Sequence, residues 1–184
     1  MNFLGLKIWL GKEGFQVYEE VHQNSINRFI HVIGLPLIVY SVLLWIYALT
    51  RNAGNKFSRI CIIAVFSAYS NFYQRIGRVD QLTWMSLIFP IMVLADKSRR
   101  MRRIKLFATL LFISCLVIQE VIGHTLFEGV NLLLAPSYVV NSILYTPFFY
   151  SHYIHQVVSF LVGHTVGSIL CIFFGVLISV LLWS

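Results

Sequence analysis

The chain has 184 residues, of which 58% are hydrophobic, 15% aromatic and only 11% charged, and its formal net charge is +7. Soluble domains have roughly 45–50% apolar and about 25% charged residues, so this composition excludes an ordinary soluble globule and predicts a polytopic membrane protein. The basic residues lie between apolar runs, which suits anionic headgroups at membrane edges better than a nucleic-acid groove. We therefore expect membrane lipids as partners and no nucleic acid.

The first 24 residues contain an apolar patch between Phe3 and Leu10. This patch is too short and too interrupted for a signal peptide. Its aromatic and aliphatic side chains are typical of a segment that lies on a membrane surface. We predict an amphipathic interfacial helix over residues 1–24.

Six apolar stretches follow, and each is expected to be a helix because backbone groups in lipid must be satisfied within their own segment. They cover residues 29–49, 59–73, 82–95, 104–122, 130–150 and 157–183. The second and third are shorter than the roughly 17 residues that a crossing needs, so they form either a tilted pair or an incomplete hairpin. The prediction is an all-α, polytopic membrane helix bundle of five to six segments. It is a single domain, with a core at 25–150 and an additional membrane helix at 151–184.

The run at 96–105 holds six Lys or Arg residues and predicts a cytoplasmic loop. Counting crossings from this loop places His22, His31 and His124 on one side of the membrane, provided that both short segments cross. Basic residues before the first span also favour the cytoplasmic face and would place the opposite side of the protein there. Charge alone therefore leaves the orientation open. The expected location is the endoplasmic reticulum membrane of a eukaryote or the inner membrane of a bacterium, and the oligomeric state is left open.

A polar cluster precedes the first long apolar run, in the stretch "VHQNSINRFIHVIGLP" at 21–36. His22 and His31 are nine residues apart, which places them on opposite faces of one continuous helix. They converge only if the chain breaks between them, and Asn24 is a good N-cap residue at that point. Asn27, one turn before His31, is positioned to orient it. The alternative is that both histidines simply cap the first membrane helix.

A second polar stretch, "QEVIGHTLFEGVN" at 119–131, follows the fourth apolar run. Glu120, His124 and Glu128 are spaced at i, i+4 and i+8, so on an α-helix they form one stripe. Metal sites on helices use this His–Glu spacing, and so does a plain Glu–His hydrogen bond at a helix end. Gly123 permits close approach of another backbone or a ligand.

These two stretches resemble the motifs of a membrane-embedded 2-hydroxy fatty acid dioxygenase family, found in fungi and bacteria, which acts in the α-oxidation step of phytosphingosine breakdown. The matching positions are His22, Asn24, Asn27, His31, Gly34 and Pro36, followed by Gly123, His124, Phe127 and Glu128. The pattern departs at Ser25, where the family has proline, and at Glu120, where it has glutamine. Lys97 stands where the family has a histidine.

The resemblance implies an Fe(II)-dependent dioxygenase that uses O2 to convert a 2-hydroxy long-chain fatty acid into an aldehyde one carbon shorter. Imidazoles and carboxylates suit non-haem Fe(II). The implied roles are iron ligation by His22, His31 and His124, ligation or base catalysis by Glu128, orientation of ligands by Asn27 and Glu120, and substrate-carboxylate binding by Arg28. Arg28 could equally be an interfacial cation whose charged end reaches the headgroups.

The tripeptide "GHT" occurs at 123–125 and again at 163–165. His164 is therefore a possible additional ligand that replaces the histidine missing at position 97. We favour chance as the explanation of so short a repeat. Placing His164 at the site also requires the last helix to pack against the segment at 104–122.

Two alternatives of other classes remain. Buried His and Glu residues in a polytopic bundle could form a metal or proton site of a transporter. They could also belong to a non-catalytic protein that retains a metal site. The polar residues lie at segment ends and the chain has no convincing repeated halves, which favours the enzyme over the transporter.

Overall fold

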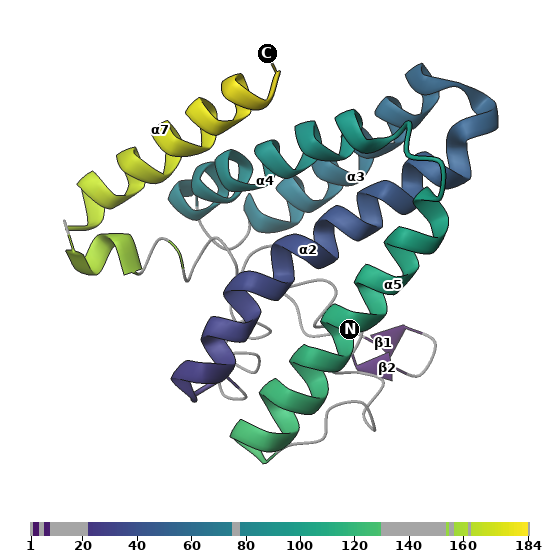
Figure 1. Ribbon diagram of the computed structural model, residues 1–184. Coiled ribbons are helices and arrows are strands. Elements are labelled where there is room, and N and C mark those ends of the chain that lie inside the picture. Colours follow the sequence, from purple (N-terminus) through teal and green to yellow (C-terminus); the bar gives the residue numbers. More distant parts are fainter. Residues whose placement is uncertain are drawn as a thin grey trace.

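The computed structural model describes residues 2–3, 6–7, 22–74, 78–129, 154, 157–161 and 163–183. The described part of the chain is a bundle of helices (Figure 1). Its principal elements are α2 (Ser25–Thr50), η1 (Arg51–Ala53), α3 (Asn55–Gln74), α4 (Arg78–Ser98), α5 (Ile104–Val117), η2 (Ile118–Glu128) and α7 (His164–Trp183).

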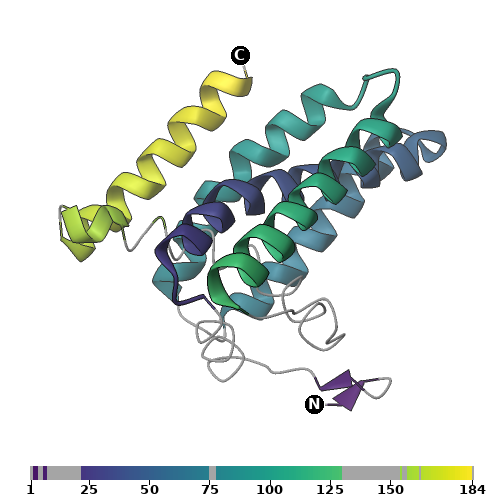
Figure 2. The ribbon, with the colours of Figure 1, turned by 60° about the horizontal axis from the view of Figure 1, so that its bottom comes forward.

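Helix α2 is the centre of the bundle. It packs against α5 and η2 on one side and against α3 and α4 on the other (Figures 1 and 2). Helix α7 packs against α4 and lies at the outside of the bundle. The helical class expected from the sequence is therefore confirmed, and the apolar stretches at 59–73 and 82–95 lie within α3 and α4.

Helix α2 begins where the sequence predicted a break. Asn24 has extended backbone angles (φ −74°, ψ 130°), and its side-chain oxygen accepts a hydrogen bond from the Ile26 amide at 2.8 Å. This contact satisfies one of the amides that a helix start leaves unpaired. His22 therefore lies before the helix, whereas His31 lies within its second turn.

Helix α5 continues directly into η2, which is a π-helix from Ile118 to Glu128. Its hydrogen bonds span five residues instead of four, and π-helical turns are often found at functional sites. The α-helical spacing predicted for Glu120, His124 and Glu128 is therefore wrong, because this element is π-helical. Gly129, with φ 69°, ends the element in the left-handed conformation that glycine adopts without strain.

The apolar core lies around the second half of α2. Leu44 is fully buried there, and Ala95 and Ala108 let α4 and α5 approach closely. The whole cluster consists of Leu43, Leu44, Tyr47, Ala48, Ile62, Ala95, Ile104 and Ala108. The first half of α2 buries polar side chains instead, so it is this half that carries a candidate site.

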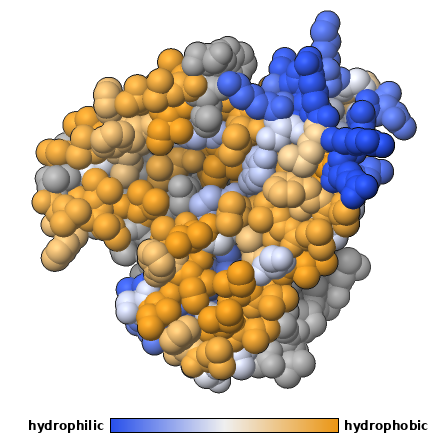
Figure 3. Space-filling model, viewed as in Figure 1, coloured by the Kyte–Doolittle hydropathy of each residue, from blue (hydrophilic) through white to orange (hydrophobic). Residues whose placement is uncertain are grey.

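The outer surface is strongly apolar, and one end of the molecule carries a hydrophilic cap (Figure 3). Within the described ranges, two helices are long and apolar enough by length and composition to cross a membrane, at Ser25–Ala53 and Ile104–Glu128. The predicted segment at 130–150 lies outside the described residues. The number of crossings is therefore still a prediction.

The predicted N-terminal helix is wrong at its first residues. Asn2–Phe3 (β1) and Leu6–Lys7 (β2) pair as two short antiparallel strands, with Phe3 opposite Leu6. The remainder of the segment at 8–21 lies outside the described residues.

Candidate metal centre

Three histidines from two distant parts of the chain meet inside the bundle. His22 precedes α2, His31 lies in α2, and His124 lies in η2; all three are at most 2% exposed. One ring nitrogen from each lies within 4.8 Å of the others. The ring centroids are 4.5 to 5.0 Å apart, and the rings meet edge to face.

The distances fit a shared metal ion. The Nε2 atoms of His22 and His31 are 3.2 Å apart. Two nitrogen ligands at about 2.1 Å from one ion lie this far apart when the angle between them is about 100°. The facing nitrogens cannot both carry protons at this distance, so at least one presents its lone pair to the other.

The orientation of His31 is set by the α2 backbone. Its Nδ1 lies 2.9 Å from the carbonyl oxygen of Asn27, which accepts a hydrogen bond when Nδ1 carries the proton. That tautomer leaves Nε2 as the lone-pair nitrogen facing His22. The sequence analysis expected the Asn27 side chain to orient His31, but this contact is made by the Asn27 backbone.

The Asn27 side chain instead reaches across to η2. Its Nδ2 lies 3.4 Å from Nδ1 of His124 and donates to Oε1 of Glu128 at 3.1 Å. Asn27 is fully buried, and its Oδ1 has no hydrogen-bond partner among the described residues. One side chain therefore contacts both a cluster histidine and the acid one turn further along η2.

Glu128 joins the end of η2 to the start of α2. Its Oε1 also accepts a hydrogen bond from the Asn24 amide at 2.7 Å. A carboxylate at a helix N-terminus is favoured by the helix dipole as well as by this hydrogen bond. Among the described residues, the group whose ligand atoms lie close enough to share one ion contains the three histidines and not Glu128.

Arg28 turns back toward the chain before α2. Its Nε donates to the carbonyl oxygen of His22 at 2.6 Å, which is a charge-assisted contact. This bond holds the backbone that carries His22 against the first turn of α2. A structural role for Arg28 thus exists alongside the substrate role that the resemblance implies.

Two glycines allow α2 and η2 to approach closely. A Cβ at Gly123 would overlap Oδ1 of Asn27, and a Cβ at Gly34 would overlap Nε2 of Gln119. Sequence reasoning noted Gly34 as a matching position but did not recognise Gln119. The available signal was that Gly34 lies one turn after His31, on the same face of α2.

The two remaining predicted site residues are Glu120 and His164. Glu120 is buried, and its Oε2 has no hydrogen-bond partner among the described residues. His164 is the first residue of α7, but its side chain lies outside the described part of the chain. Helix α7 packs against α4, whereas the predicted role of His164 requires it to pack against the segment at 104–122.

Comparison with known proteins identifies the chain's relatives. The family model described as "2-hydroxy-palmitic acid dioxygenase Mpo1-like" matches residues 11–154. No curated protein and no solved structure matches the chain significantly. The family match covers the whole segment that brings the three histidines together and more than three quarters of the chain. The chain therefore belongs to the Mpo1-like 2-hydroxy-palmitic acid dioxygenase family, in agreement with the resemblance noted in its two polar stretches.

Proposed function

We propose that this protein is an Fe(II)-dependent dioxygenase that cleaves a 2-hydroxy long-chain fatty acid with O2 to an aldehyde one carbon shorter. The observation that carries the proposal is the buried cluster of His22, His31 and His124, whose ligand atoms lie within 4.8 Å of one another. Family membership supplies the substrate class and the type of reaction.

The donor set is compatible with iron. Neutral imidazole binds Fe(II), and three protein ligands leave coordination positions open for substrate and O2. When bound there, Fe(II) would supply the redox chemistry that allows O2 to react with a 2-hydroxy carboxylate. Zinc accepts the same ligands, so the choice of iron rests on the family.

The surrounding residues hold the ligands in place. The Asn27 carbonyl orients His31, and Arg28 holds the carbonyl of His22. Glu128 and the Asn27 side chain keep η2, and with it His124, against the first turn of α2. We propose that Glu128 also acts as a ligand or base during turnover, and that Arg28 binds the substrate carboxylate.

The surface around the cluster suits an acyl chain. Phe29 and Leu126 are 64% and 69% exposed on α2 and η2, the two elements that carry the histidines. In a bilayer these apolar side chains would face lipid, so a fatty acid could approach the cluster without crossing water. We propose five to six membrane segments, in the endoplasmic reticulum membrane of a eukaryote or the inner membrane of a bacterium.

The test uses the full-length protein, loaded anaerobically with Fe(II) and assayed for bound iron and for O2 uptake with 2-hydroxypalmitate. We expect about one iron per chain, O2 consumption and the shortened aldehyde. The variant with all three histidines replaced by alanine should lose both iron and turnover. Bound iron without turnover would contradict the enzyme and favour a non-catalytic metal protein, whereas metal flux into liposomes would favour a transporter.

A further inference from the structure

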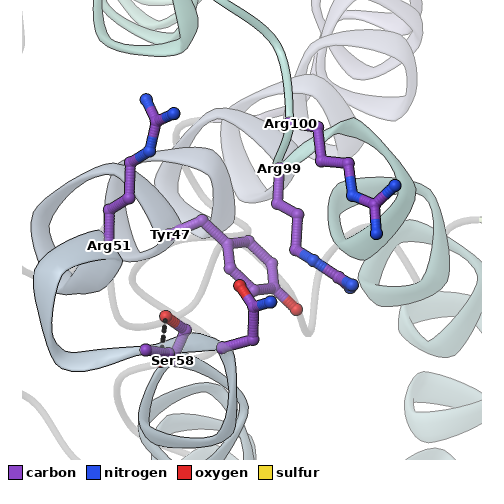
Figure 4. A pocket seen from close by; sticks show the side chains of 7 residues that line it. Tyr47, Arg51, Ser58, Arg99 and Arg100 are labelled. Carbon is purple, nitrogen blue, oxygen red and sulfur yellow. Dashed lines mark hydrogen bonds between the residues drawn. The ribbon is translucent and has the colours of Figure 1, made fainter.

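A polar pocket of about 350 Å³ lies at the opposite end of α2 from the histidine cluster. It is formed where α2 passes into η1 and α3, and where the turn after α4 approaches them (Figure 4). The lining residues are Tyr47, Arg51, Gly54, Asn55, Ser58, Arg99 and Arg100. Three of these side chains are guanidinium groups, and none is a carboxylate.

The carboxylate of Asp96, which contacts Tyr47 and Arg99 of the pocket lining, is already engaged. Asp96 forms a two-point ion pair with Arg59, at 2.8 and 3.1 Å, and a second ion pair with Arg99. The Tyr47 hydroxyl also donates to Asp96 at 2.6 Å. Asp96 thus has no further capacity to neutralise Arg51 or Arg100.

The pocket therefore retains uncompensated positive charge. Within the described residues, no hydrogen bond or ion pair engages the guanidinium group of Arg51 or Arg100. The Nε of Arg99 is buried and likewise has no acceptor among the described residues. Three guanidinium groups that line one pocket, with no carboxylate in its lining, favour an anionic ligand there.

The polar groups beside the arginines suit a phosphate. Helix α3 begins at Asn55, so its first amides lie at the pocket and can donate to phosphate oxygens. Gly54 has φ 92°, a left-handed conformation that a side chain would strain, and this turn brings the helix start to the pocket. Arginine forks match phosphate oxygens by pairs of hydrogen bonds.

The position also suits a membrane surface. Helix α2 has 26 residues and is about 39 Å long, which exceeds the roughly 30 Å thickness of a bilayer hydrocarbon core. The pocket lies at the end of the molecule that carries the hydrophilic cap (Figure 3). Lys56, Arg102 and Arg103, which are close in sequence to lining residues, are also exposed. If α2 crosses, the histidine cluster and the pocket face opposite headgroup layers.

We propose that this pocket binds the phosphate group of an anionic ligand through Arg51, Arg99 and Arg100. The phosphate comes either from an acidic phospholipid headgroup or from a soluble phosphate compound. The site is independent of the proposed oxygenase chemistry, because none of its residues contacts the histidine cluster.

The test compares two double variants of the full-length protein. R51Q/R100Q removes two charges from the pocket, and R102Q/R103Q removes two charges from the exposed turn beside Arg100 without altering the lining. Both are checked by circular dichroism and size exclusion. Binding of inorganic phosphate is followed by calorimetry, and binding of phosphatidic acid, with phosphatidylcholine as reference, by native mass spectrometry.

We expect R51Q/R100Q to bind the phosphate ligand about tenfold more weakly than R102Q/R103Q, which should resemble the unmodified protein. Binding of phosphatidic acid alone identifies a lipid site, and binding of inorganic phosphate as well identifies a general phosphate site. Equal losses in both variants, or no binding of either probe, would overturn the proposal.

A measurement on the unmodified protein covers the case in which R51Q/R100Q does not fold. Phenylglyoxal modifies arginine side chains, and the modified positions are mapped by mass spectrometry. A bound phosphate should protect Arg51 and Arg100 but leave Arg102 and Arg103 reactive. Uniform reactivity with and without ligand would contradict the site.

Discussion

The Nε2 atoms of His22 and His31 lie 3.2 Å apart although nine residues separate the two histidines. On one helix they would point in opposite directions. They meet because the chain before α2 turns back at Asn24, and His124 of η2 completes the group. The cluster therefore depends on a helix cap and on a helix–helix contact at the same time.

Removing a cluster histidine should remove the metal. We expect His124→Ala to lower iron occupancy and O2 uptake with 2-hydroxypalmitate by more than about 100-fold. Loss of a hydrogen-bond partner of a ligand lowers metal affinity by about 10- to 100-fold, and loss of the ligand itself should lower it further. The iron bound per chain is measured by elemental mass spectrometry. Full occupancy in this variant would show that the metal binds elsewhere.

His164 provides the matched control for that experiment. Among the described residues, helix α7 packs chiefly against α4, which does not carry a cluster histidine. We therefore expect His164→Ala to leave iron content and turnover within about twofold of the unmodified protein. A large loss of iron would instead make His164 a fourth ligand and require α7 to contact the cluster.

Substitutions at Glu128 distinguish two roles for its carboxylate: holding η2 against the start of α2, or binding the metal. Its Oε1 accepts from the Asn24 amide and from Asn27 Nδ2. Glu128→Ala removes both bonds and should weaken iron binding by about 10- to 100-fold. Glu128→Gln keeps one acceptor oxygen, so a positioning role predicts substantial rescue of iron affinity, whereas a metal-ligand role predicts little.

Gly34 and Gln119 form a pair suited to a double-mutant cycle. Gly34→Ala should destabilise the protein by about 1–3 kcal/mol, because the new methyl group would overlap the Gln119 side chain. Gln119→Ala shortens that side chain and should recover part of the loss in the double variant. Thermal unfolding in detergent measures the three variants, and strictly additive effects would contradict the contact.

Asp96 should make stability depend on pH in the acid range. Burial raises the pKa of this carboxyl, but hydrogen bonds from Arg59, Tyr47 and Arg99 outweigh burial and hold the pKa well below its ordinary value of 3.8. A lowered pKa in the folded state stabilises the protein above about pH 4, and this contribution is lost as the pH falls below that value. Asp96→Asn should be less stable than the unmodified protein at pH 7, and the difference should shrink toward pH 3. A difference that is constant with pH would exclude this ionisation.

Some of this architecture follows from local sequence. The apolar stretches at 59–73 and 82–95 predicted helices that α3 and α4 confirm, and Asn24 predicted the start of α2. These are local effects, since hydrophobic run length and an N-cap hydrogen bond involve only neighbouring residues. The same local reasoning failed at Asn2–Phe3 and Leu6–Lys7, which pair as strands.

The sequence by itself determined which histidine and acidic side chains are available as metal ligands. It also determined that the helix breaks between His22 and His31. It could not show that η2 is a π-helix, nor that Asn27 reaches His124 and Glu128 about a hundred residues away. Only the tertiary structure decided these points, and it also decided that Arg51, Arg99 and Arg100 line one pocket. The physical reason is that such contacts depend on how closely two helices pack. The distance between α2 and η2 is small because Gly34 and Gly123 have no side chain. Gln119 occupies the space beside Gly34, and Asn27 occupies the space beside Gly123, so residues of both helices set this distance.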